Sequence, residues 1–178
     1  ANYGSKEAGW WWYVEVREDI EKLYKKNEIN FRERAILITS LIYASDKIAN
    51  TCGHYDAYRE NIDLKDDIFL KHLDIFHDKN SNNEIYNTDS NILFEQLNYN
   101  VDIVYADPPY NSRQYSSLYH LVENLARWEK PDVEGKASKM KNRKELNSKY
   151  CNKTAIETFE ELISNVKAKY FILSYSNM

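Results

Sequence analysis

The chain has 178 residues, of which 43% are hydrophobic and 29% charged, as is typical of one globular domain with or without a small appendage. No apolar run approaches the roughly 18 residues of a membrane-spanning helix and no signal-peptide pattern is present, so we expect neither a membrane nor a secreted protein. Cys52 and Cys151 lack metal-type spacing and indicate reduced thiols of a cytoplasmic protein, while the net charge of −4 argues against a strongly basic surface but allows a local basic patch.

The N-terminal part of the chain is predicted to be mainly helical. Residues 15–26 carry apolar side chains at the three-to-four spacing of an amphipathic helix. A second helix over residues 31–49 is predicted to be the core helix of this part. Between the two, Asn30 followed by Glu33 resembles a capping box, in which each side chain accepts a hydrogen bond from the other residue's backbone amide.

Two stretches in this part lack a clear period. Trp10–Tyr13, four consecutive aromatic residues, is either a strand or irregular segment buried against the following helices, or a platform on which bases stack. Residues 66–76 alternate without a clean pattern, so both a helix and a strand are possible there.

A polar turn and a polar linker follow the second helix. Gly53 can take a positive φ and is predicted to break that helix. The turn His54–Arg59 could then contact a ligand or pack as an ordinary surface turn. Residues 78–83 are predicted to be the linker, which divides the chain into regions 1–83 and 84–178.

Strands and helices alternate beyond the linker. Strands are predicted over residues 84–86, 101–106 and 170–175, and helices over residues 90–97, 116–128 and 155–166. Residues 131–153 are predicted to be a long polar loop. This order and spacing predict an α/β fold with a parallel, doubly wound sheet.

The motif Asp107-Pro108-Pro109-Tyr110 follows the strand at 101–106 without a spacer. Because each proline lacks an N–H and fixes φ, the chain leaves the sheet in a stiff, extended form. That stiffness fixes the carboxylate, the first proline's carbonyl and the tyrosine ring relative to one another. Asp89 also follows a predicted strand, and acids at the carboxyl ends of neighbouring parallel strands could line one crevice.

From about residue 20 to residue 178, the chain resembles a known family. The motif continues as DPPYNSRQY, and further matching text lies at Ala49–Thr51, Gly53–Tyr58, Tyr119–His120, Glu123–Asn124 and Leu173–Ser176. In this text the chain is similar to the site-specific adenine DNA methyltransferases of restriction–modification systems, which use S-adenosylmethionine. The resemblance implies part of a Rossmann-like methyltransferase sheet in region 84–178, and a share in target recognition for region 1–83.

The same resemblance implies roles for individual residues. Asp107, Pro108 and Tyr110 would be catalytic, and Asp89 together with Asp107 would bind the cofactor. The carboxylate of Asp107 and the carbonyl of Pro108 could accept hydrogen bonds from the adenine amine, and so stabilise the positive charge that develops on nitrogen. Tyr110 would stack on a base flipped out of duplex DNA. No metal is needed, and the His and Cys spacing suggests none.

The expected DNA contacts come from the loop after DPPY and, by resemblance, from the turn after the second helix. These residues are Asn111, Arg113, Gln114, Tyr115, Tyr55, Tyr58 and Arg59. Arg113 is the preferred phosphate ligand. Residues 136–153 carry seven Lys or Arg against the single acid Glu145, and form either a solvated loop or a flap that contacts phosphates. His120 is expected to pack and to form a hydrogen bond rather than to catalyse.

One feature of the family is missing from this sequence. The family carries a glycine-rich F-x-G-x-G loop that holds the methionine part of the cofactor, and the four glycines of this chain never occur as G-x-G. We therefore expect a fragment, whose glycine-rich loop lies on a separate chain or segment. Two alternatives remain open: a non-catalytic DNA-binding or specificity subunit or inactive remnant, and an enzyme that methylates RNA or a protein amide.

Overall fold

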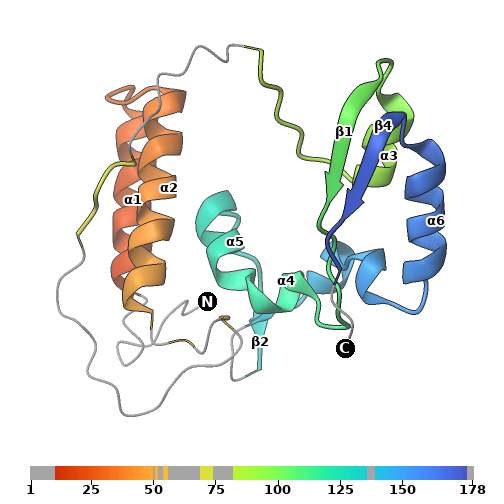
Figure 1. Ribbon diagram of the computed structural model, residues 1–178. Helices are drawn as coiled ribbons and strands as arrows, with labels where there is room; N and C mark the ends of the chain where they lie inside the picture. Colours follow the sequence, from red (N-terminus) through yellow and green to blue (C-terminus); the bar gives the residue numbers. More distant parts are fainter. Residues whose placement is uncertain are drawn as a thin grey trace. The chain divides into compact units, whose positions relative to one another are not determined.

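The computed structural model describes residues 11–49, 51, 54–55, 69–73, 82–135 and 139–175 (Figure 1). The chain forms two compact units. The helical unit consists of Ala1–Phe76 and Tyr115–Leu146, and the sheet unit of His77–Gln114 and Asn147–Met178.

Two helices joined by a short turn form the base of the helical unit. These are α1 (Trp11–Lys25) and α2 (Phe31–Ile48), which lie side by side in Figure 1. The predicted capping box is confirmed: the Glu33 amide donates to Asn30 Oδ1 at 3.0 Å, and the Asn30 amide donates to Glu33 Oε2 at 2.8 Å. The box satisfies backbone donors that the first turn of α2 would otherwise leave unpaired.

The aromatic stretch before the predicted first helix is helical where the structure describes it. Trp11–Tyr13 opens α1, so the predicted strand or irregular segment is wrong, whereas the predicted burial against the following helices is confirmed at Tyr13. The base-stacking role stays a prediction, and Trp10 lies outside the described residues. The reason for the helix is packing. Tyr13, Arg17 and Ile20 recur at the helical spacing and are all buried, and Tyr13 and Ile20 join the hydrophobic core with Ile38, Leu41 and Leu125.

The helix predicted over residues 116–128 is two helices, α4 (Tyr115–Leu118) and α5 (His120–Arg127). Tyr119 separates them with φ −118° and ψ 16°, outside the helical region. The helix α5 ends at Trp128, which adopts the left-handed conformation with φ 61° and ψ 32°. Its buried Leu125 joins the same core as α1 and α2, so α5 completes a three-helix packing.

The polar stretch predicted as a loop contains short elements. In the helical unit, β2 (Val133–Glu134) and β3 (Lys139–Met140) form an antiparallel hairpin, and η2 (Arg143–Leu146) follows it. In the sheet unit, η3 (Lys149–Cys151) precedes the last helix. One buried side chain anchors the stretch in each unit: Met140, at 4% exposure, in the helical unit and Cys151, at 7%, in the sheet unit. The polar composition of the stretch gave no sign of these buried positions.

Two parallel strands and two helices form the sheet unit. The strands β1 (Val101–Ala106) and β4 (Ala168–Leu173) pair in parallel, and α3 (Ser90–Gln96) packs against α6 (Ala155–Asn165) on one side of them (Figure 1). All four elements were predicted, and the parallel pairing is confirmed. The mixture of helices with a small parallel sheet is compatible with an α/β fold.

The strand predicted over residues 84–86 does not form. Ile85 is 96% exposed, so no neighbouring strand or helix buries it. The Glu84 carboxylate instead accepts hydrogen bonds from the hydroxyls of Tyr86 and Tyr99, which fold the segment on itself. Within the described residues, the neighbour of β1 in the sheet is therefore β4, and Asp89 does not follow a strand.

One face of the β1–β4 pair is apolar and uncovered among the described residues. Val104 is buried, at 8% exposure. On the opposite face, the register places Ile103 beside Tyr170 and Tyr105 beside Ile172, and these four side chains are 49–63% exposed. Parallel sheets in α/β proteins are normally covered on both faces.

Some predictions fall where the structure describes little or nothing. The break at Gly53 and most of the turn His54–Arg59 lie outside the described residues, and of the stretch 66–76 only residues 69–73 are described, with neither helix nor strand. None of the helices built from described residues is both long and apolar enough to span a bilayer.

Candidate active site

The DPPY motif leaves the sheet at the carboxyl end of β1. Ala106 is the last residue of the strand, and its carbonyl accepts a hydrogen bond from the Ser174 amide at 2.9 Å. Ser174 follows β4 directly, so the two strand ends lie at one edge. Asp107 therefore starts at the edge where open parallel sheets bind their ligands.

The polar groups of the motif are exposed at this edge. Asp107 is exposed and Tyr110 is 45% exposed. Among the described residues, the Asp107 carboxylate has neither a hydrogen bond nor an ion pair. Its oxygens can thus accept hydrogen bonds from a ligand without first giving up a protein partner.

The backbone after the motif turns sharply. Asn111 Oδ1 accepts a hydrogen bond from the Arg113 amide at 2.9 Å, an Asx turn that uses the Asn111 side chain locally. The Arg113 carbonyl accepts from Cys151 Sγ at 3.4 Å. The Arg113 side chain is exposed and makes no ion pair within the described part of the chain, which leaves its guanidinium available to an anion.

Gln114, an expected DNA contact, holds another segment of the sheet unit. Its Oε1 accepts from the Ser148 amide at 2.8 Å, and its Nε2 donates to the Ser148 carbonyl at 3.2 Å. The same Nε2 lies 3.1 Å from Asn152 Oδ1. The side-chain amide is therefore engaged at both ends, while its DNA-binding role stays a prediction.

Asp89, the expected cofactor ligand, is the N-cap of α3. Its Oδ1 accepts a hydrogen bond from the Asn91 amide at 2.9 Å, and the residue is exposed. An ionised carboxylate has several acceptor positions, so one capping bond leaves capacity for a ligand's hydroxyl or amine. Asp89 thus suits the nucleoside or amine part of S-adenosylmethionine by its chemistry, though it reaches its place as a helix cap rather than at a strand end.

A buried network fixes the start of α3, and the sequence did not reveal it. The Asn91 side chain is buried, and its Nδ2 donates to the Thr158 carbonyl at 3.0 Å and to Glu161 Oε2 at 2.8 Å. The Tyr150 hydroxyl donates to Asn91 Oδ1 at 2.7 Å. Burial raises the pKa of Tyr150 above its ordinary value, so the hydroxyl stays protonated as a donor.

Aromatic rings in edge-to-face contact extend this network toward the end of β4. The Tyr150 ring meets Phe159 edge-to-face with centroids 5.0 Å apart, and Phe159 meets Tyr175 in the same way at 5.8 Å. Tyr150 lies in the stretch predicted as a polar loop. Its only sequence signal was an aromatic residue in an otherwise charged stretch.

A second group of expected DNA contacts comes together in the helical unit. The Tyr119 ring lies 5.6 Å from that of Tyr115 and 6.4 Å from that of Tyr55, both edge-to-face. Tyr55 is held by its amide, which donates to the Leu118 carbonyl at 2.9 Å, and by its hydroxyl, which donates to Asp46 at 3.0 Å. Burial and that hydrogen bond raise the pKa of Tyr55. Tyr58 and Arg59, expected in the same group, lie outside the described residues.

His120 is a packing residue, as expected. It is 1% exposed, and its Nδ1 lies 2.9 Å from the Ser117 carbonyl. Because a carbonyl only accepts, Nδ1 carries the proton in this contact.

Some of the basic residues in 136–153 are paired within the helical unit. Arg143 Nη1 contacts Glu134 Oε1 at 2.6 Å and the Met140 carbonyl at 2.8 Å, and Lys141 lies 3.5 Å from Asp132. The Arg143 guanidinium lowers the pKa of Glu134. These pairs reduce the charge that the stretch presents, and a phosphate-contacting role for it remains a prediction.

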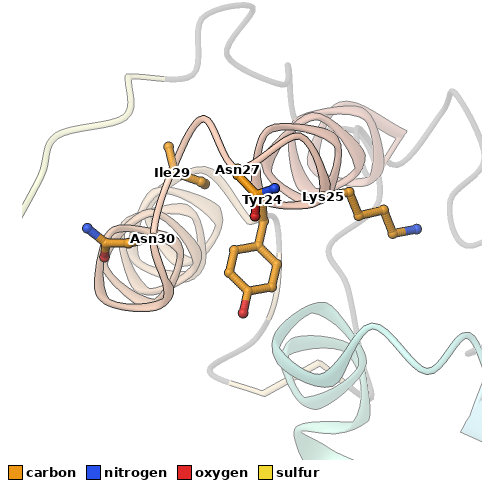
Figure 2. A pocket seen from close by; sticks show the side chains of 5 residues that line it. All are labelled: Tyr24, Lys25, Asn27, Ile29 and Asn30. Atoms are coloured by element: carbon orange, nitrogen blue, oxygen red, sulfur yellow. The ribbon is translucent and has the colours of Figure 1, made fainter.

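Two further features bear on the location of the site. An open hollow of about 450 Å³ lies at the α1–α2 turn, where Figure 2 shows Tyr24, Lys25, Asn27, Ile29 and Asn30 around it. It includes none of the predicted site residues. Among the described residues, no three His, Cys, Asp or Glu side chains are grouped so that they could hold a metal ion.

Comparisons with known proteins relate the whole described chain to one family. The family model described as D12 class N6 adenine-specific DNA methyltransferase matches residues 10–177. Modification methylase StsI of Streptococcus sanguinis and type II methyltransferase M.FokI of Planomicrobium okeanokoites are each 39% identical over 165 residues, which cover 91% of this chain and 25% of each relative. Type II methyltransferase M.NlaIII of Neisseria lactamica is 34% identical over 167 residues, 91% of this chain and 48% of that relative. No solved structure matches the chain significantly.

Proposed function

The chain belongs to the D12 class of N6 adenine-specific DNA methyltransferases, and from this premise we propose that it supplies the acceptor half of an adenine-methylating active site. The proposed reaction transfers a methyl group from S-adenosylmethionine to the exocyclic amine of adenine in a specific sequence of double-stranded DNA. One observation carries the proposal: DPPY emerges at the carboxyl end of β1 with the Asp107 carboxylate exposed and unpaired among the described residues. The chain spans between about a quarter and a half of the length of the relatives compared, so the activity of the whole protein is part of the proposal.

Asp107 and Pro108 act on the amine in this proposal. The lone pair of the adenine amine is delocalised into the ring, which makes it a poor nucleophile. Hydrogen bonds from the amine to the Asp107 carboxylate and the Pro108 carbonyl localise that lone pair and stabilise the positive charge that grows on nitrogen. As the nitrogen–carbon bond forms, the electrons of the carbon–sulfur bond stay on sulfur, and Asp107 is a ready acceptor for the amine proton.

The cofactor supplies an activated methyl group when it is bound. Two carboxylates suit its hydroxyls and its amine: Asp89, which has acceptor capacity beyond its capping bond, and Asp107. The network of Asn91 and Tyr150 holds Asp89 in place. The chain's own residues thus fit the adenosine end of the cofactor by their chemistry.

DNA is bound, in this proposal, by side chains of the motif and its following loop, and by side chains of the helical unit. Tyr110 stacks on the flipped adenine, because the amine of a paired base cannot be reached. Arg113, whose guanidinium has no ion-pair partner among the described residues, contacts a phosphate. The Tyr55–Tyr115–Tyr119 rings belong to a recognition surface in the helical unit, together with Tyr58 and Arg59.

A second body completes the site in this proposal. The sequence has no G-x-G loop for the methionine part of the cofactor, and the uncovered face of Ile103, Tyr105, Tyr170 and Ile172 is of the kind that α/β sheets bury. We infer that a segment or separate chain carrying a glycine-rich loop covers this face and extends the sheet into a Rossmann-like fold. An enzyme that methylates the DNA of its own cell acts in the cytoplasm. The buried Cys151 thiol stays reduced in that compartment.

A methyl-transfer assay tests the proposal. The chain is mixed with S-adenosylmethionine labelled in its methyl group and with unmethylated duplex DNA, with and without the polypeptide that carries the glycine-rich loop. Label is expected in the DNA, and nucleoside analysis is expected to find it as N6-methyladenine. Label found in RNA or in a protein amide instead would show that the acceptor is not adenine in DNA. DNA binding without transfer in both mixtures would favour the non-catalytic specificity subunit.

A further inference from the structure

A single side chain joins the loop after DPPY to a segment more distant in sequence. Gln114 makes three hydrogen bonds to the two residues that flank η3: it accepts from the Ser148 amide at 2.8 Å and donates to the Ser148 carbonyl at 3.2 Å and to Asn152 Oδ1 at 3.1 Å. The first two form a two-way pair between the side-chain amide of Gln114 and the backbone N–H and C=O of Ser148. All the partners lie within the sheet unit. We call this set of bonds the Gln114 clamp.

Neighbouring residues reinforce the clamp. Cys151, which is 7% exposed, donates its thiol to the Arg113 carbonyl at 3.4 Å. Asn111 closes the turn from the other side through its bond to the Arg113 amide. The loop backbone is thus tied at Arg113 and Gln114, while the Tyr110 ring and the Arg113 guanidinium stay exposed.

We propose that Gln114 is a positioning residue, whose clamp holds the loop after DPPY so that the Pro108 carbonyl and the Tyr110 ring keep a productive place. The proposal rests on the proposed function for its link to catalysis. Two prolines restrain the chain before Tyr110, and the clamp restrains it after Asn111, so the short span between them has little freedom. Groups fixed before the reaction need no ordering when the substrate binds.

The chemistry of an amide explains why glutamine suits this position. Only a side chain with an acceptor and a donor at its end can pair with both the backbone N–H and the backbone C=O of one residue. A direct DNA contact by Gln114 would break this pair and leave the Ser148 peptide groups without their partners, which costs free energy. The clamp and a DNA contact are therefore competing roles that an experiment can separate.

The buried thiol reports whether the clamp is closed. The chain has two cysteines, so Cys151 is its only thiol in a Cys52→Ser background. The rate at which iodoacetamide alkylates that thiol then measures how often it becomes exposed. Loss of these hydrogen bonds is expected to make local opening about ten times more frequent. Gln114→Ala is thus expected to raise the alkylation rate of Cys151 about tenfold. Gln96→Ala, which changes the other glutamine of the chain, an exposed residue of α3, should leave the rate unchanged.

An isosteric variant separates the clamp from the size of the side chain. Gln114→Glu keeps an acceptor for the Ser148 amide, but its ionised form has no donor for the Ser148 carbonyl or Asn152. A protonated carboxyl regains one donor. The ratio of its alkylation rate to that of the background protein should therefore rise at neutral pH and fall toward one as the pH is lowered. This variant and Asn152→Ala, which removes one bond only, also serve if Gln114→Ala does not fold.

Positioning is read out in two ways, one of them independent of activity. Amide hydrogen exchange of residues 110–114 should speed up in Gln114→Ala, with exchange in α6 unchanged. In methyl transfer, kcat should fall at least tenfold while the dissociation constant for duplex DNA stays within about twofold.

Other outcomes overturn the proposal. Unchanged alkylation and exchange in Gln114→Ala would show that no clamp operates. A weakened DNA affinity with an unchanged alkylation rate would assign Gln114 to direct DNA contact. Faster alkylation with an unchanged kcat would make the clamp purely structural. If no preparation transfers methyl groups, the proposed function fails, and the alkylation and exchange rates still decide whether Gln114 holds the loop.

Discussion

Asp107 and Arg113 are six positions apart, and both present charged groups that no described residue neutralises. Arg143 and Glu134, in contrast, form an ion pair. An acceptor that stays unpaired at a strand end, close to an unpaired guanidinium in sequence, suits a substrate that offers both an amine and a phosphate. A flipped nucleotide offers both.

The role of Arg113 leads to a prediction about salt. If its guanidinium binds one phosphate, Arg113→Ala should weaken DNA binding on specific and unrelated duplexes alike, because phosphate contacts carry no sequence information. The slope of log K against log salt concentration should become less steep by about 0.9. Titration of labelled duplexes at several salt concentrations measures this slope.

A matched variant controls for the loss of one positive charge. Arg32→Ala removes an exposed arginine from α2, in the other unit. It should change the slope by less than half as much. If the slope changed equally in both variants, Arg113 would affect DNA binding only through the net charge of the chain.

At the scale of elements, a buried arginine fixes α5 to α1. Arg17 is 0% exposed, and its Nε donates to the Leu125 carbonyl at 2.7 Å near the end of α5. Its guanidinium also lies over the Trp128 ring, 5.2 Å from the centroid. Arg17 thus satisfies a carbonyl that the helix end would leave unpaired. Through this bond α1 fixes the helix that begins with His120.

Glu21 completes this partly buried ion network and makes it sensitive to pH. It pairs with Arg17, and it accepts from Arg34 Nε at 2.7 Å. Burial by itself would raise the pKa of Glu21, but the hydrogen bonds from the two arginines outweigh it and lower the pKa. A lowered pKa in the folded state means a contribution that is fully present above the unfolded pKa of about 4.3 and is lost as the pH falls through the folded value.

Glu21→Gln is therefore expected to lower the free energy of unfolding at pH 7 by on the order of 2 kcal/mol. The difference from the unmodified chain should shrink as the pH drops below about 4. Urea unfolding followed by helical circular dichroism measures both values. Glu28→Gln, at an exposed residue whose carboxylate lies 3.9 Å from Lys26, is the control and should have little effect. A difference that is the same at pH 3 and pH 7 would refute the ionic role of Glu21.

Elements with a strong local signal could be predicted from the sequence. The capping-box pair Asn30 and Glu33 predicted the start of α2. The strand β1 has the predicted bounds because the prolines after Asp107 end it. Elements decided by tertiary contacts could not. The aromatic start of α1 is helical because Tyr13 is buried against helices distant in sequence, and Glu84–Tyr86 is not a strand because no neighbour pairs with it.

The candidate site shows the same division. Asp107, Tyr110 and Arg113 could be predicted as candidate site residues, because they lie within the contiguous sequence motif DPPYNSRQY. The bonds that hold the loop could not, because Gln114 meets Ser148 across a long stretch of chain, and nothing in either local sequence marks the pair. Tyr150 and Asn91 were hidden for the same reason.

At the scale of the whole molecule, the chain combines a packed helical unit with a sheet unit that has two strands among its described residues. The sheet unit presents the acceptor motif and leaves one apolar face uncovered, and the sequence has no glycine-rich loop for the donor. In the proposed function, these features place the two substrates on two bodies: this chain would hold the amine, and the partner segment would hold the methionine part of the donor.

The most direct test of this account compares two acids of one segment in a preparation that transfers methyl groups. Asp107 follows β1, and Asp102 is an exposed acid within it, so both substitutions remove one exposed carboxylate. Asp107→Ala should lower kcat at least 100-fold, because it removes an acceptor for the charge on nitrogen, while the affinity for duplex DNA is retained. Asp102→Ala should keep more than half of the activity. A protein that loses Asp107 and still methylates adenine at a tenth or more of the original rate would contradict the assignment of the acceptor site to DPPY.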